Sequence, residues 1–141
     1  MKTIKNLTVC VAVITTLGVS TAVLAGAFPP PPVDHSNVTI NNNSPSTFHW
    51  QYSATYGACS ASPSSANELS GQQGEQSNVT CSWTAQGEFD FTALSGQVIG
   101  SVNVGYGPCR LLSNNSPYQI TVSGGVSACD ITVSDLSKKQ G

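Results

Sequence analysis

A short phrase that occurs twice constrains the fold of this chain more than any other feature. The phrase is Tyr56-Gly57-Ala58-Cys59 and again Tyr106-Gly107-Pro108-Cys109, fifty residues apart. A second cysteine follows each copy, Cys81 after 22 residues and Cys129 after 20 residues. Glycine after tyrosine permits a turn at a strand end, and the cysteine beyond it can fasten that turn to a later strand. The pattern therefore predicts an internal repeat of one disulfide-held unit.

These four cysteines predict two disulfides, and three connectivities are possible in principle. The repeat favours pairing within each half, Cys59 with Cys81 and Cys109 with Cys129. The crossed pairing, Cys59 with Cys109 and Cys81 with Cys129, stays open if the two copies lie side by side. Cys10 belongs to a segment that we expect to be removed, so it is not counted among the cysteines that form disulfides.

The first 27 residues have the pattern of a secretory signal peptide. Lys2 and Lys5 precede an almost unbroken apolar stretch over residues 9–24, and small residues suited to cleavage follow. The proline run at 29–32 cannot continue a helix, so we predict no transmembrane segment. We expect a secreted or periplasmic protein, in a compartment where cysteines are oxidised.

Size and charge restrict the domain count and the partners. About 115 residues remain after cleavage, enough for one ordinary domain. Seven acids against three bases give that part a net charge of −4, so nucleic acid and anionic membranes are poor electrostatic partners. Charged residues are 9% of the chain, against about 25% in typical globular proteins. Ser, Thr, Asn, Gln and Gly replace them, a composition typical of exported β-proteins.

Three parts are expected after the signal peptide. Residues 28–36 are a Pro-rich extended leader. A single β-domain is predicted over residues 37–137, with halves at about 37–86 and 87–137. The last residues, 138–141, form a solvated tail.

Alternation of apolar and polar residues predicts about eight short strands. Together with the absence of helical periodicity, it predicts an all-β fold, an antiparallel β-sandwich or small barrel stapled by two disulfides. The longest irregular stretch is expected at residues 60–76. The predicted inward faces are Val38 and Ile40; Phe48, Trp50 and Tyr52; Val79, Cys81 and Trp83; Phe89, Phe91 and Ala93; Val98, Val102, Val104 and Tyr106; Tyr118, Ile120 and Val122; and Cys129, Ile131 and Val133.

Residues with catalytic or metal-binding chemistry are few. His35 and His49 are the only histidines, and a zinc site needs three or four ligands, so we predict no metal and no cofactor. Glu88 and Asp90 share a strand face and resemble a glycosidase carboxylate pair in composition only. We predict a protein that is not an enzyme, with a small hydrolase using His49 as an alternative.

Arg110 supports a second alternative. The segment Gly107-Pro108-Cys109-Arg110-Leu111 resembles the reactive loop of Kunitz-type trypsin inhibitors, in which Gly-Pro-Cys precedes a basic residue. The resemblance implies a disulfide-held loop that presents Arg110 to an acidic specificity pocket. The rest of the chain lacks that family's cysteine framework.

Two further segments resemble aegerolysins, small β-sandwich proteins that bind lipids. These are Gly87-Glu-Phe-Asp-Phe91 and Ile131-Thr-Val-Ser-Asp-Leu136, and the resemblance implies a β-sandwich and a lipid ligand. The exported, disulfide-stapled design departs from that family.

Tyr56 and Tyr106 lie at predicted strand ends, where an exposed ring can contact a ligand. Function concentrates on loops held by a rigid scaffold, so we expect the two Tyr-Gly turns to form the contact surface. The leading hypothesis is a non-enzymatic exported domain that recognises a glycan, a lipid or a protein, with Tyr56, Tyr106 and Arg110 as candidate ligand-binding residues.

Overall fold

The computed structural model describes residues 33–138, which form ten strands and one short 3-10 helix. The predicted signal peptide, residues 28–32 of the leader and residues 139–141 of the tail lie outside the described residues. The elements are β1 (Val33–Asn43), β2 (Phe48–Tyr56), β3 (Cys59–Ser62), β4 (Ser65–Glu68), β5 (Glu75–Ser82), β6 (Gln86–Ala93), β7 (Val98–Asn103), β8 (Arg110–Asn114), β9 (Tyr118–Gly124), β10 (Ala128–Asp135) and η1 (Leu136–Lys138).

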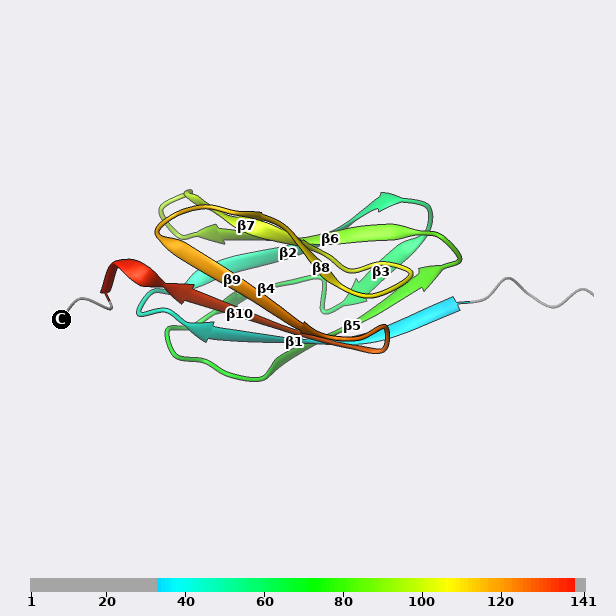
Figure 1. The fold of residues 1–141 in the computed structure, drawn as a ribbon, viewed down its shortest axis with the longest axis horizontal. Helices are drawn as coiled ribbons and strands as arrows, with labels where there is room; N and C mark the ends of the chain where they lie inside the picture. Colours follow the sequence, from blue (N-terminus) through cyan, green and yellow to red (C-terminus); the bar gives the residue numbers. More distant parts are fainter. Residues whose placement is uncertain (1–32, 139–141) are drawn as a thin grey trace, which may run out of the picture. The chain divides into compact units, whose positions relative to one another are not determined.

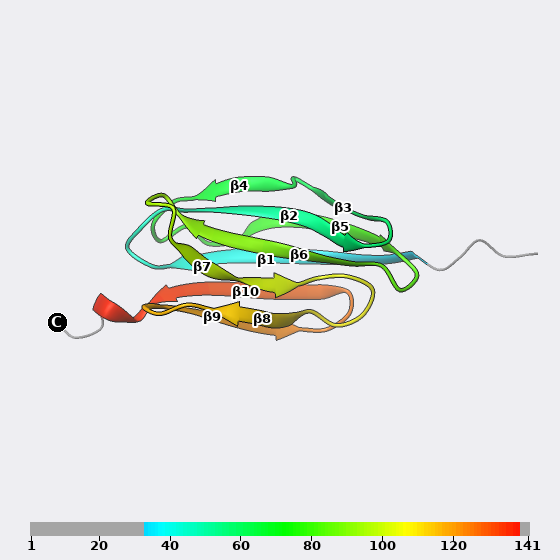
Figure 2. The same cartoon turned by 90° about the horizontal axis from the view of Figure 1, so that it is seen from above.

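The strands form two five-stranded sheets that pack face to face (Figures 1 and 2). Sheet A has the order β3-β5-β1-β10-β9 and sheet B the order β4-β2-β6-β7-β8. All pairings are antiparallel except that of β1 with β10, which is parallel. The predicted all-β sandwich is therefore confirmed. The parallel pair of β1 and β10 needs no crossover helix, because the chain between these two strands forms the other strands of both sheets.

Alternation along each strand places one set of side chains between the sheets. Trp50 and Phe89 pack with ring centroids 5.4 Å apart, and Phe48 meets Phe91 edge to face at 5.8 Å. Burial of such rings supplies most of the hydrophobic stabilisation of a small core. The predicted inward faces are confirmed where every member is buried, which holds for Val38 and Ile40; Phe48, Trp50 and Tyr52; Phe89, Phe91 and Ala93; and Cys129, Ile131 and Val133.

One buried carboxyl group lies among these rings. Glu68, at the end of β4, is fully buried, and its Oε1 accepts a hydrogen bond from Trp50 Nε1 at 3.2 Å. Its other oxygen, Oε2, has no hydrogen-bond partner among the described residues. Burial raises the pKa of Glu68 from 4.5 to about 7; the Trp50 hydrogen bond lowers this pKa and the charge of Glu75 raises it further.

The predicted disulfides are both present, Cys59 with Cys81 and Cys109 with Cys129. They join different kinds of position. Cys59 and Cys81 are directly opposed on neighbouring strands of sheet A, with Cα atoms 4.2 Å apart. Cys109 immediately precedes β8 of sheet B, whereas Cys129 lies in β10 of sheet A, so the second disulfide joins the two sheets. The two copies of the phrase therefore form different kinds of disulfide, one within a sheet and one between the sheets. Duplication of the two halves stays a prediction.

Two expectations from the sequence are wrong in detail. The segment 60–76 is not one irregular loop, since it contains most of β3, all of β4 and the start of β5. Polar strands at sheet edges lack the apolar alternation that marks inner strands, so the pattern missed them. Val98 is 57% exposed because a register shift between β6 and β7 turns Ile99 inward in its place.

The domain also begins earlier than expected. β1 starts at Val33, where the sequence predicted the leader to continue to residue 36, and Ser36 and Asp34 pair with β5. Among residues 33–138, no helix has the length and apolar character needed to cross a lipid bilayer.

Candidate functional site

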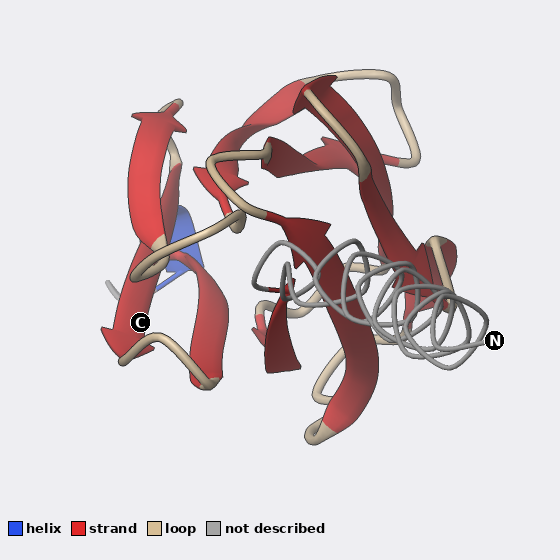
Figure 3. Ribbon diagram, turned by 90° about the vertical axis from the view of Figure 1, so that its right-hand side faces the viewer, coloured by secondary structure: helices blue, strands red, loops and turns tan. Residues whose placement is uncertain are grey.

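The two Tyr-Gly turns lie next to the turn between β5 and β6, at one end of the sandwich (Figure 1). Figure 3 looks onto this end. Tyr56 is paired with Gln86 at the start of β6. The backbone N–H of Tyr106 donates to the carbonyl of Ala85 at 2.8 Å, and Gln86 Nε2 donates to the carbonyl of Tyr106 at 3.3 Å. Both turns therefore adjoin Ala85 and Gln86, although they are fifty residues apart in the sequence.

Glycines permit this close approach around the buried Ala85. A Cβ atom added to Gly57 would lie 2.9 Å from the Cβ of Ala85, and Gly57 has a φ of +68°. On the other side, a Cβ atom added to Gly105 would lie 2.7 Å from the carbonyl oxygen of Ala85. Both distances are too short for real side chains, so glycine is required at each turn.

Exposed aromatic rings gather at this end. Tyr56 is 69% exposed and Trp83 is 60% exposed, while Tyr106 is half-buried. We refer to these three residues as the aromatic end. Trp83 was predicted to face the core, and that prediction is wrong. β5 ends at Ser82, one residue before it, so the inward alternation stops there and Trp83 lies in the turn.

The turn that carries Trp83 is strained. The N–H of Ala85 donates to the carbonyl of Ser82 at 2.9 Å, which closes a four-residue turn. Thr84 has a φ of +64°, and it is the one non-glycine residue with positive φ among residues 33–138. A β-branched side chain is unfavourable in this region, and such strain is concentrated at functional positions. Trp83 is thus exposed on a turn that is itself costly to form.

Glycine in place of Thr84 is expected to stabilise the protein by about 1 kcal/mol, because glycine adopts positive φ without steric cost. Thermal denaturation measures the effect. Thr92→Gly, within β6, is the matched control and should destabilise the protein, since glycine weakens a strand interior. Destabilisation by Thr84→Gly would contradict the strain argument.

A small hollow of about 190 Å³ lies beside the rings, and we call it the Arg110 hollow. It contains two of the three predicted ligand-binding residues, and Tyr56 lies outside its lining. Asn103 forms one wall and is held by donation from its Nδ2 to the carbonyl of Gly87 at 3.0 Å. The lining residues are Gln86, Asn103, Tyr106, Pro108 and Arg110.

The loop that precedes Arg110 is braced from sheet A. Asp34, the second residue of β1, accepts a hydrogen bond from the N–H of Gly107 at 3.1 Å. Arg110 itself is exposed and is paired with Asn103 as the first residue of β8. A strand position hydrogen-bonded into a sheet differs from the free, protruding loop that an inhibitor inserts into a protease pocket.

The two histidines lie in different sheets, His35 in β1 of sheet A and His49 in β2 of sheet B. His35 Nδ1 is 3.1 Å from Thr80 Oγ1, and His49 Nδ1 is 3.0 Å from Asn67 Oδ1 in the other sheet. Within residues 33–138 there is no group of three or more His, Cys, Asp or Glu side chains that could hold a metal ion. Glu88 and Asp90 are neighbours on the outer face of sheet B, where burial, and secondly the charge and hydrogen bond of Asp90, raise the pKa of Glu88.

No family model matches this chain, and no curated protein matches it. Among solved structures, the crystal structure of IP-1A from Alcaligenes faecalis is similar, with a TM-score of 0.54 and 12% sequence identity. The match covers 72% of this chain and 91% of that one. At this identity the similarity shows a shared fold alone.

Proposed function

We propose that this protein is an exported, non-enzymatic binding domain whose contact surface is the aromatic end. The observation that carries the proposal is the joint exposure of Tyr56 and Trp83 on turns that adjoin the Cys59–Cys81 disulfide. Asp34 and the Cys109–Cys129 disulfide hold the neighbouring turn of Tyr106. Large exposed rings are costly in water and are enriched at binding surfaces. A rigid scaffold reduces the ordering cost of binding.

Among glycan, lipid and protein ligands, the geometry favours a lipid surface. The Arg110 hollow, at about 190 Å³, has room for one small polar group, so most of the contact must come from rings that protrude beside it. Tyrosine and tryptophan combine an apolar body with a polar tip and are preferred at the interface between membrane and water. The same hollow can accommodate a lipid headgroup.

Charge favours an uncharged or zwitterionic lipid. Arg110 is the only lysine or arginine between residues 6 and 137. Attraction to an anionic membrane requires a cluster of basic residues, and each one near the surface contributes about 1 kcal/mol. A single arginine beside aromatic rings suits the phosphate of a neutral headgroup better than an anionic surface.

Vesicles of phosphatidylcholine provide the test, measured by sedimentation and by tryptophan fluorescence. The chain has two tryptophans, and Trp50 is fully buried, so a blue shift on binding would come from Trp83. We expect wild-type protein to bind these vesicles and Trp83→Ala to bind about tenfold more weakly, because the variant loses the apolar area of one ring.

Leu94→Ala is the matched control, because Leu94 is 67% exposed at the opposite end of β6 and should not affect binding. Absence of vesicle binding by the wild type would overturn the lipid ligand. Equal binding by Trp83→Ala and the wild type would overturn the aromatic end as the contact surface.

A further inference from the structure

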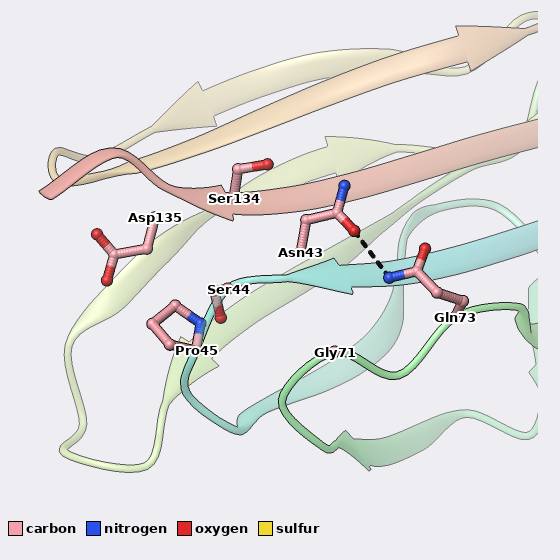
Figure 4. A pocket seen from close by; sticks show the side chains of 7 residues that line it. All are labelled: Asn43, Ser44, Pro45, Gly71, Gln73, Ser134 and Asp135. Carbon is pink, nitrogen blue, oxygen red and sulfur yellow. Dashed lines mark hydrogen bonds between the residues drawn. The ribbon is translucent and has the colours of Figure 1, made fainter. Parts of the chain in front are cut away.

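A second and larger hollow lies at the other end of the sandwich, and we call it the polar hollow (Figure 4). Its volume is about 600 Å³. Four separate segments contribute to it, namely the end of β1, the β1–β2 loop, the β4–β5 loop and the end of β10. The lining residues are Asn43, Ser44, Pro45, Gly71, Gln73, Ser134 and Asp135.

One buried side chain fixes the two loops that form its walls. Asn42 is fully buried, and its Nδ2 donates to the carbonyls of Ser46 at 2.8 Å and Leu69 at 3.0 Å. Its Oδ1 accepts from the N–H and the hydroxyl of Ser44 at 2.8 and 2.6 Å. The β1–β2 and β4–β5 loops are thus joined through one amide, and the walls are formed before any ligand arrives.

The amides that face the hollow are also oriented. Gln73 Nε2 donates to the carbonyl of Asn42 at 3.2 Å and to Asn43 Oδ1 at 2.8 Å. Within residues 34–137, Gln73 Oε1 and Asn43 Nδ2 make no hydrogen bond to protein, so an acceptor and a donor stand next to each other. Adjacent hydroxyl groups of a sugar each donate and accept, and they match such a pair.

The lining excludes several other ligand classes. Among the residues that the structure describes, none with a basic side chain lines the hollow, so an anionic ligand would find no opposite charge there. Pro45 is the only apolar side chain in the lining, so an apolar ligand would have one apolar side chain to pack against. Amides and hydroxyls make up the remaining side chains. A neutral, polyhydroxylated ligand is therefore the class that this hollow suits.

The polar surface continues beyond the hollow over sheet A. Asn43, Ser134 and Gln119 are in register across β1, β10 and β9, and Thr132 and Thr121 are paired in the next row. Side chains two residues apart on one face lie about 7 Å from each other, and neighbouring strands are about 4.8 Å apart. A chain of sugars could thus extend from the hollow over hydroxyls and amides.

We propose that the polar hollow binds a sugar residue of a neutral glycan chain. The site is separate from the aromatic end, so the domain would have a lipid-binding end and a glycan-binding end. Affinity would be modest, on the order of 1 mM, because hydrogen bonds at an exposed site each contribute little.

Nitrogen-15 labelled protein titrated with maltohexaose, cellohexaose and N-acetylchitohexaose tests the proposal by chemical-shift mapping. We expect at least one of these oligosaccharides to shift the side-chain amide signals of Asn43 and Gln73 in a saturable way. Ser134→Tyr fills the hollow from a strand position that accepts aromatic residues, and it should weaken binding about tenfold or more.

Gln51→Tyr places the same ring on an exposed strand position of sheet B, away from the hollow and from the polar rows of sheet A, and should retain binding. Gln73→Ala, in an exposed loop, gives a second measure should Ser134→Tyr fold poorly, and it too should weaken binding. Trp83→Ala should bind the oligosaccharide normally, which separates this site from the aromatic end. No shift with any of the three oligosaccharides at about 10 mM would overturn the proposal, as would unchanged binding by Ser134→Tyr and Gln73→Ala.

Discussion

Glutamine in place of Glu68 is expected to stabilise the protein by about 3 kcal/mol at pH 8 and to leave its stability near pH 4 unchanged. The cause is the burial that raises the pKa of Glu68 from 4.5 to about 7. Between these two values the unfolded chain releases the proton while the folded protein keeps it. The wild type therefore loses stability as the pH rises from 4.5 to 7, and the loss is constant above pH 7. Glutamine does not ionise and retains the oxygen that accepts from Trp50.

Urea denaturation of the wild type and of Glu68→Gln at pH 4, 5.5, 7 and 8 measures this difference. Taking the difference between the two proteins cancels the contribution of other ionisable groups such as Glu88. Glu75→Gln is the control, because Glu75 contributes only a lesser part of the raised pKa of Glu68, and its difference from the wild type should be small. A difference between Glu68→Gln and the wild type that does not change with pH would contradict the buried ionisation.

Removing either disulfide by a double alanine substitution is expected to cost about 3 kcal/mol, since the enclosed loops have similar lengths of 22 and 20 residues. The local consequences should differ. All five residues of β8 are exposed, so this edge strand has little core contact of its own, and Cys109 joins its start to β10. Without that disulfide, we expect the amides of β8 to exchange with solvent much faster than those of β6.

Each double variant is the control for the other. Cys59→Ala with Cys81→Ala removes a link within sheet A and should leave the protection of β8 intact. Hydrogen exchange followed by mass spectrometry distinguishes the two. Equal protection of β8 in both variants would show that hydrogen bonds to β7, and not the disulfide, hold this strand.

The sequence predicted the inner strands well because burial on one face leaves a strict alternation, as in Phe48, Trp50 and Tyr52. The disulfide pairing was predicted from the repeated spacing, and it is confirmed. The short edge strands β3 and β4 could not be predicted, because strands that are mostly exposed carry no apolar pattern. The carboxyl group of Glu68 gave no signal either, since a buried acid and an exposed acid look alike in a sequence.

The candidate site was predicted in part. The sequence pointed to the turns at Tyr56 and Tyr106, and the structure places these turns at one end, around the buried Ala85. It assigned Trp83 to the core because alternation was extended one residue past the end of β5. The polar hollow could not be found in this way, because its walls come from four segments that are distant along the chain.

The parallel pairing of β1 with β10 has a consequence for how the protein is made. These two strands are central in sheet A, yet they are the first and the last strands of the domain. The pairing of β1 with β10 is therefore missing from the sheet until the final strand has left the ribosome. Such non-local pairing is a source of slow folding, because a long segment must close before the contact forms. The central pair of sheet A thus forms only after the whole domain has been synthesised, so no shorter nascent chain contains the complete fold.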